Sequence, residues 1–129
     1  MSSEKLRVIV IGLDGATFDL ILPWVNEGYL PTFKKLMGEG TWGELQSTLP
    51  PLTGPAWSSF ITGKNPGKHG IYDFIFRNPE GYHWTTVNAT HRDGISLWRW
   101  LSDHNKRVVV FNVPATYPPE PVNGVMISG

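Results

Sequence analysis

The sequence has no cysteine, and this absence excludes a disulfide framework and any zinc site built on thiolates. It also has no excess of charge, because eleven Lys and Arg residues balance eleven Asp and Glu residues. The chain as a whole therefore has no field that would attract nucleic acid or an anionic membrane. Its apolar runs are too short to span a bilayer, and none near the amino terminus is closed by a small-residue cleavage site. We expect a cytoplasmic protein, without nucleic-acid or membrane partners, that recognises any phosphate group locally.

Hydrophobic residues make up 40 % of the 129 residues, which is enough for one compact domain with a buried core. Continuous β-branched runs are typical of strands buried on both faces, and they predict strands at residues 7–13, 107–113 and 125–128. Helical spacing of apolar residues, together with proline, serine and glycine end signals, predicts helices at residues 19–27, 31–39, 55–61 and 96–104. Shorter strands are predicted at 41–47 and, paired around a turn at 78–81, at 71–76 and 82–87.

Apolar strands separated by helices indicate an α/β protein with a largely parallel sheet. No linker or repeat divides residues 1–129, so we expect them to form part of a single domain. The last predicted strand, 125–128, is not followed by the covering helix that usually completes such a sheet. We therefore expect a core that is incomplete at the C-terminus.

Asp14 follows the first predicted strand, within Gly12-Leu13-Asp14-Gly15. In open parallel α/β sheets, ligands bind beyond the carboxyl ends of the strands. A carboxylate there is well placed to bind a hard cation or zinc. An Asp after a buried strand is as often a turn former or a helix cap, so the residue alone leaves both interpretations open.

Thr53 precedes Gly54-Pro55 at the amino end of a predicted helix. Helix N–H groups and the positive end of the helix dipole favour an anion there, so a phosphoryl group could lie against it. A threonine hydroxyl needs a base or a metal to become a nucleophile at neutral pH. From chemistry alone Thr53 could equally be an ordinary capping or loop hydroxyl, as could the nearby Thr48, Ser58 and Ser59.

A longer motif around Thr53 helps to decide whether this residue is a nucleophile or an ordinary hydroxyl. Residues 53–71 contain a threonine, a proline two residues later, and then Thr-Gly-x-x-Pro-x-x-His-Gly-Ile. This stretch resembles the signature of type I phosphodiesterases and nucleotide pyrophosphatases, which belong to the alkaline phosphatase superfamily. Asp14, in an apolar segment upstream, falls where that family keeps its first metal ligand, and the segment from Leu30 to Gly40 is also similar.

The resemblance implies a three-layer alkaline-phosphatase-like core and a metal-dependent phosphoesterase. It implies two divalent metal ions, usually zinc, with Asp14 and Thr53 as ligands and Thr53 as the nucleophile that becomes phosphorylated. The remaining ligands would come from downstream segments that this sequence does not contain, so this fragment would be inactive alone. The substrate would be a small-molecule phosphate ester.

One residue departs from the family pattern. Diesterases of the family commonly carry an asparagine three residues after the nucleophile, and here that position is Ala56. The missing amide puts diesterase and nucleotide specificity in doubt. The backbone N–H of Gly54 could take over the donor role to a phosphate oxygen.

The histidines show no paired ligand spacing. We interpret His69, which belongs to the family motif, as a structural residue rather than a ligand, and His83, His91 and His104 as surface or turn residues.

Two other functions stay open: a phosphomutase or phosphotransferase of the same superfamily, and a non-catalytic binding or assembly module. Because the predicted sheet is incomplete, its open edge and apolar face also predict a homo-oligomer of the fragment.

Overall fold

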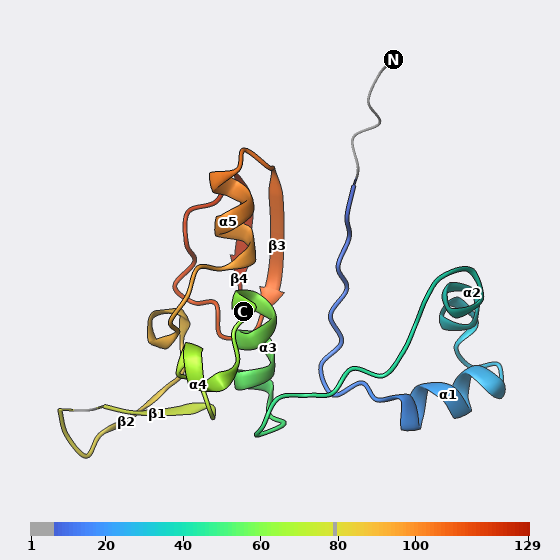
Figure 1. Ribbon diagram of the computed structural model, residues 1–129, viewed down its shortest axis with the longest axis horizontal. Coiled ribbons are helices and arrows are strands. Elements are labelled where there is room, and N and C mark those ends of the chain that lie inside the picture. Colours follow the sequence, from blue (N-terminus) through green and yellow to red (C-terminus); the bar gives the residue numbers. More distant parts are fainter. Residues whose placement is uncertain (1–6, 79) are drawn as a thin grey trace. The chain divides into compact units, whose positions relative to one another are not determined.

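The structure is a computed structural model that describes residues 7–78 and 80–129 (Figure 1). The elements follow in the order α1 (Phe18–Asn26), α2 (Pro31–Glu39), α3 (Thr53–Thr62), α4 (Pro66–His69), β1 (Ile75–Arg77), β2 (Trp84–Thr86), the 3₁₀ helix η1 (Ala89–His91), α5 (Leu97–Asp103), β3 (Val108–Val113) and β4 (Gly124–Ser128). The chain divides after Leu45 into two compact units.

The first unit contains α1 and α2, close to where the sequence predicts helices. Thr17 caps α1, because its side chain accepts the backbone N–H of Asp19 at 3.3 Å. Proline opens α2, where its missing N–H costs no helical hydrogen bond. Gly28, after α1, has a φ of +87°, a left-handed conformation that suits glycine. Both predicted helices are confirmed.

The predictions of strands at residues 7–13 and 41–47 are wrong for this structure, since neither segment belongs to a sheet. In the first segment, Val8, Ile9, Val10 and Ile11 are all exposed. A strand exists only through hydrogen bonds to a neighbouring strand. Among its described residues the first unit contains helices alone, so it offers residues 7–13 no partner. A high β propensity is therefore not sufficient here.

The second unit opens with α3, which starts two residues before the predicted helix and ends one residue after it. Gly63 ends the helix in a left-handed conformation. The short helix α4 follows, in a segment where the sequence predicts a loop. The predicted hairpin is confirmed in shorter form, with β1 and β2 antiparallel and Ile75 opposite Thr86. Pro79, in its predicted turn, lies outside the described residues.

The rest of the second unit is an α/β arrangement. Ser96 caps α5 by accepting the backbone N–H of Arg99 at 3.1 Å, as its position predicts. The strands β3 and β4 lie parallel, with Val109 opposite Val125. Together the helices and the parallel pair confirm an α/β fold.

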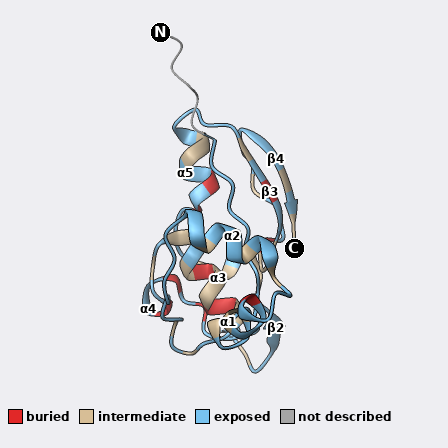
Figure 2. Ribbon diagram, turned by 90° about the vertical axis from the view of Figure 1, so that its right-hand side faces the viewer, coloured by how far each residue is buried: buried red, intermediate tan, exposed pale blue. Residues whose placement is uncertain are grey.

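The core of this unit lies where α3, α5 and β3 meet. Its buried members are Ile61, Trp98 and Val110. Figure 2 shows buried segments in red on α3 and α5. The opposite face of β3 is different, because Val109 is 79 % exposed and Phe111 is 71 % exposed. Burial of this strand on both faces, which its apolar run predicts, is therefore wrong. A run of apolar residues does not specify how many faces are covered.

Candidate active site

The first turn of α3 carries Thr53, the predicted nucleophile. Leu52 takes the N-cap position in an extended conformation, and its carbonyl accepts the N–H of Ala56 at 3.0 Å. The N–H groups of a first turn have no acceptor within their own helix, and the helix dipole is positive there. The predicted place of Thr53 at the amino end of a helix is thus confirmed, whereas its chemical role stays a prediction.

The hydroxyl groups near Thr53 are either hydrogen bonded or buried. Thr48 donates to the carbonyl of Pro50 at 2.8 Å. Ser58 is completely buried. The Oγ of Ser59 lies 2.9 Å from Nε2 of His69. Because Thr53 alone of the four begins a helix, its position is the one suited to a bound anion.

His69 is completely buried at the end of α4, and both of its ring nitrogens are hydrogen bonded. Nδ1 accepts the backbone N–H of Ile71 at 3.1 Å. An acceptor nitrogen carries no proton, so the neutral ring carries its proton on Nε2 and donates to Ser59. Burial lowers the pKa of His69, and the positive charges of Arg92 and Lys64 act in the same direction. This geometry agrees with the structural role that the sequence predicts.

The same tautomer argues against Ser59 as an alternative nucleophile. A general base must accept the proton of the attacking hydroxyl. In this structure the nitrogen that faces Ser59 is the one that carries hydrogen, since Nδ1 is already used as an acceptor. The close contact of a serine with a histidine is here a structural hydrogen bond.

Gly54, next to Thr53, allows the backbone at Asp73 to approach α3 closely. A Cβ atom placed on this buried glycine would lie 3.0 Å from the carbonyl oxygen of Asp73, tighter than ordinary van der Waals contact. The backbone at Asp73 therefore packs directly against the first turn of α3. Ile71, in the same segment, is fully buried and fixes this packing. The requirement for glycine comes from the close approach of two backbones and not from a left-handed φ.

Asp14 lies in the first unit, in a turn with Gly15 that leads into Thr17 and α1. Gly15 has a φ of +67°, which suits a glycine in a turn. The predicted placement of Asp14 directly after a strand is wrong, because residues 7–13 form none. The turn agrees with the alternative interpretation of this residue as a turn former. Its role as a metal ligand stays a prediction.

A family model described as type I phosphodiesterase / nucleotide pyrophosphatase matches residues 8–126, which is almost the whole chain. The chain belongs to this family. No curated protein and no solved structure was found to match it.

For a member of the type I phosphodiesterase family, the expected chemistry is hydrolysis of phosphate esters. Among the residues that the structure describes, no group of three or more His, Asp or Glu side chains could hold a metal ion. Within the same residues, no helix has the length and apolar character that crossing a membrane requires.

Ala56 and the loop after β3 both belong to the second unit. Ala56 lies half-buried in α3. In the loop, Thr116 is completely buried, donates to the carbonyl of Val113 at 2.6 Å and accepts the N–H of Gly129 at 3.1 Å. These bonds make Thr116 a structural residue of this loop.

Arg92 is a half-buried charge that the sequence does not reveal. Its Nη1 donates to the carbonyl of Ala115 at 3.1 Å, which links η1 to the loop after β3. Burial lowers the pKa of its guanidinium, and the Glu120 carboxylate opposes this shift. Glu120 in turn accepts a hydrogen bond from Nε1 of Trp98. The cluster stabilises the loop from within, and only the tertiary contacts could identify it.

Proposed function

We propose that this chain supplies the nucleophile and two metal ligands, Asp14 and Thr53 itself, of a metal-dependent phosphoesterase with a three-layer alkaline-phosphatase-like core. The observation that carries the proposal is the place of Thr53. It begins α3 within the region that matches the family, at a helix end suited to an anion.

In the proposed reaction, the Oγ of Thr53 attacks the phosphorus of a small-molecule phosphate ester. The bond from phosphorus to the leaving oxygen breaks, and the alcohol departs with a proton. Water then attacks the phosphothreonine, which releases phosphate and restores the hydroxyl. Gly54 follows Thr53 in the first turn, so its N–H is the proposed donor to a phosphoryl oxygen.

The chain offers two donors for the proposed metal ions: the carboxylate of Asp14 and the hydroxyl of Thr53. Both are oxygen ligands, which suit divalent cations including zinc. When bound, two such ions would activate the hydroxyl and neutralise charge on the transferring group. A closed zinc site takes about four ligands, so these donors fit part of a site and do not complete one. We therefore propose that the 129 residues alone bind metal weakly and are inactive.

The substrate class follows from Ala56. A methyl group there donates no hydrogen bond, so one contact to a non-bridging phosphate oxygen is missing. We propose that a phosphate ester is the substrate and that diester or nucleotide preference is weaker than in relatives with asparagine at this position.

The test is release of p-nitrophenol from mono- and diester substrates by the complete enzyme. Thr53→Ala is expected to remove nearly all turnover, and Thr53→Ser to keep part of it, because serine supplies the same oxygen without the methyl group that restricts its rotamer. Normal turnover by Thr53→Ala would place the nucleophile elsewhere.

The same assay separates the alternative functions. Transfer of phosphate to an added alcohol in preference to water would identify a phosphotransferase. Absence of turnover in the metal-loaded wild-type enzyme would favour a binding module.

A further inference from the structure

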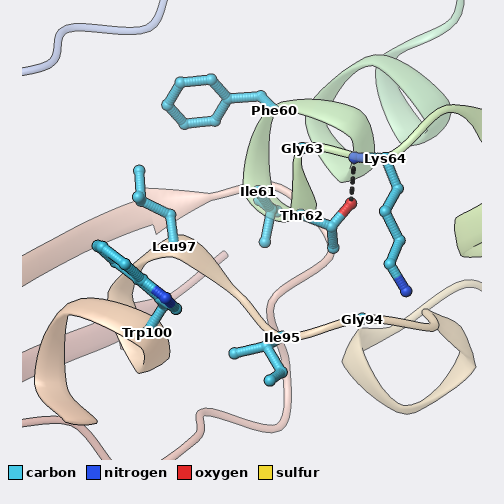
Figure 3. A pocket seen from close by; sticks show the side chains of 9 residues that line it. All are labelled: Phe60, Ile61, Thr62, Gly63, Lys64, Gly94, Ile95, Leu97 and Trp100. Atoms are coloured by element: carbon cyan, nitrogen blue, oxygen red, sulfur yellow. Dashed lines mark hydrogen bonds between the residues drawn. The ribbon is translucent and has the colours of Figure 1, made fainter. Parts of the chain in front are cut away.

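A groove of about 630 Å³ lies between the last turn of α3 and the first half of α5 (Figure 3). Its volume is within the range of small-molecule sites. Thr53 begins α3 and the groove lies at the other end of that helix, about 13 Å away along the axis at 1.5 Å per residue. The groove is therefore separate from the proposed nucleophile.

Most of the groove is apolar. Its walls include Phe60, Ile95, Leu97 and Trp100, all of which are exposed. Figure 3 shows Phe60, Leu97 and Trp100 along one side and Lys64 along the other. Exposed apolar side chains that gather around a hollow are a feature of binding sites.

Lys64 is the one charged residue that lines the groove. Its backbone N–H donates to the hydroxyl of Thr62 at 3.2 Å. Its stem passes close to Gly94, where an added Cβ would lie 3.2 Å from Cε of the lysine. In the part of the chain that the structure describes, the ion pair that forms joins Arg99 to Asp103, so the Lys64 ammonium has no carboxylate partner there.

We propose that this groove binds an amphipathic monocarboxylate. An apolar body would cover the side chains of Phe60, Leu97 and Trp100, and the carboxylate would pair with the Lys64 ammonium. A single lysine neutralises a single negative charge, whereas a phosphate monoester would bring a second charge with no cation to meet it. The complementarity of charge and surface thus favours a monoanion such as a carboxylate over a phosphate monoester.

Octanoate is the probe for this site, and its binding to the full chain can be measured by titration calorimetry. Octanol and octyltrimethylammonium are the matched ligands without the negative charge. Octanoate is expected to bind about tenfold more tightly than either ligand. This factor corresponds to the usual free energy of a hydrogen bond to a charged group.

Two lysine variants test whether Lys64 supplies the positive charge that binds the carboxylate. Lys64→Met keeps an unbranched stem and is expected to weaken octanoate roughly tenfold. Lys68→Met is the control, since Lys68 is exposed and does not line the groove. It is expected to leave the affinity unchanged.

A second pair of variants keeps the test valid if Lys64→Met folds poorly. Ile95 is 64 % exposed, so polar replacements there are expected to be tolerated. Ile95→Asp should weaken octanoate and Ile95→Lys should strengthen it. The proposal is overturned if octanol binds as tightly as octanoate, if the two Ile95 variants bind octanoate equally, or if none of the probes binds.

Discussion

The backbone N–H of Ile71 points at Nδ1 of His69 across 3.1 Å and thereby fixes which nitrogen of this buried ring carries the proton. The other nitrogen then ties Ser59 of α3 to the end of α4. The neutral ring is required for the bond to Ile71, because a protonated ring has no acceptor for that N–H, whereas the N–H at Nε2 is present in both forms. Stability of the second unit should therefore depend on the charge of His69.

We predict that the chain loses stability as the pH falls below about 6.5, the usual pKa of histidine. Burial lowers the pKa of His69 in the folded state, so the unfolded chain binds the proton first. The stabilisation by neutral His69 is complete above that value and is lost as the pH falls toward the folded pKa. Urea unfolding between pH 7.5 and 5.5 measures the change.

The matched variants for this prediction are His69→Gln and His83→Gln. His69→Gln is expected to cost roughly 2 kcal/mol at neutral pH, because two buried hydrogen bonds are disturbed. It should also flatten the pH dependence. His83 is exposed, so His83→Gln should leave the wild-type pH profile in place. If the unfolding free energy depends on pH equally in His69→Gln and in wild type, the role assigned to His69 is contradicted.

Gly54→Ala should destabilise the chain by about 1–3 kcal/mol, the usual cost of overpacking. The new methyl group would meet the backbone carbonyl of Asp73 at 3.0 Å, and neither backbone can move away without shifting α3. Gly67→Ala is the control, because its methyl group would have ordinary contacts, the nearest at 3.5 Å. Thermal unfolding of the two variants measures the difference in stability. Equal melting temperatures would show that the backbone at Asp73 can shift at little cost in free energy.

Ala56→Asn should raise diesterase turnover in the complete enzyme relative to monoesterase turnover. The change introduces an amide donor, and one good donor at a reacting oxygen contributes up to about 3–4 kcal/mol. The measurement is kcat/KM for bis-p-nitrophenyl phosphate and p-nitrophenyl phosphate. Ala56→Leu adds bulk without a donor and serves as the control. An unchanged ratio would show that another group already donates to that oxygen.

We predict that the 129-residue chain self-associates through the exposed face of its parallel sheet. Val109 and Val125 are opposite each other across the two strands, as are Phe111 and Ile127. All four are more than half exposed, which leaves a continuous apolar face. Exposed sheet surfaces of this kind favour pairing with another chain. Sedimentation equilibrium over a tenfold range of concentration tests it, and a constant monomer mass would refute it.

Phe111→Glu is the matched variant for self-association, because it places a charge at the centre of that face. It should shift the chain toward monomer. Tyr82→Glu, on the exposed hairpin turn, adds the same charge elsewhere and should not.

Local signals in the sequence determined most helices and the family. Thr17 and Ser96 cap their helices, and proline opens α2, because these interactions involve residues only a few positions apart. The spaced motif from Thr53 to Ile71 likewise needs no tertiary information. Pro55 separately predicts a helix that begins close to Thr53, and the structure confirms that helix, with α3 beginning at Thr53.

Only the tertiary structure decided the features that depend on distant partners. Residues 7–13 have the composition of a strand, yet a ladder needs a second strand, which their own unit does not provide. The exposed face of β3, the tautomer of His69 and the partial burial of Arg92 follow from what packs against each residue. The groove at Lys64 exists because α3 and α5 meet there. Sequence patterns report local preference and apolar content, whereas burial and pairing are properties of the assembled chain.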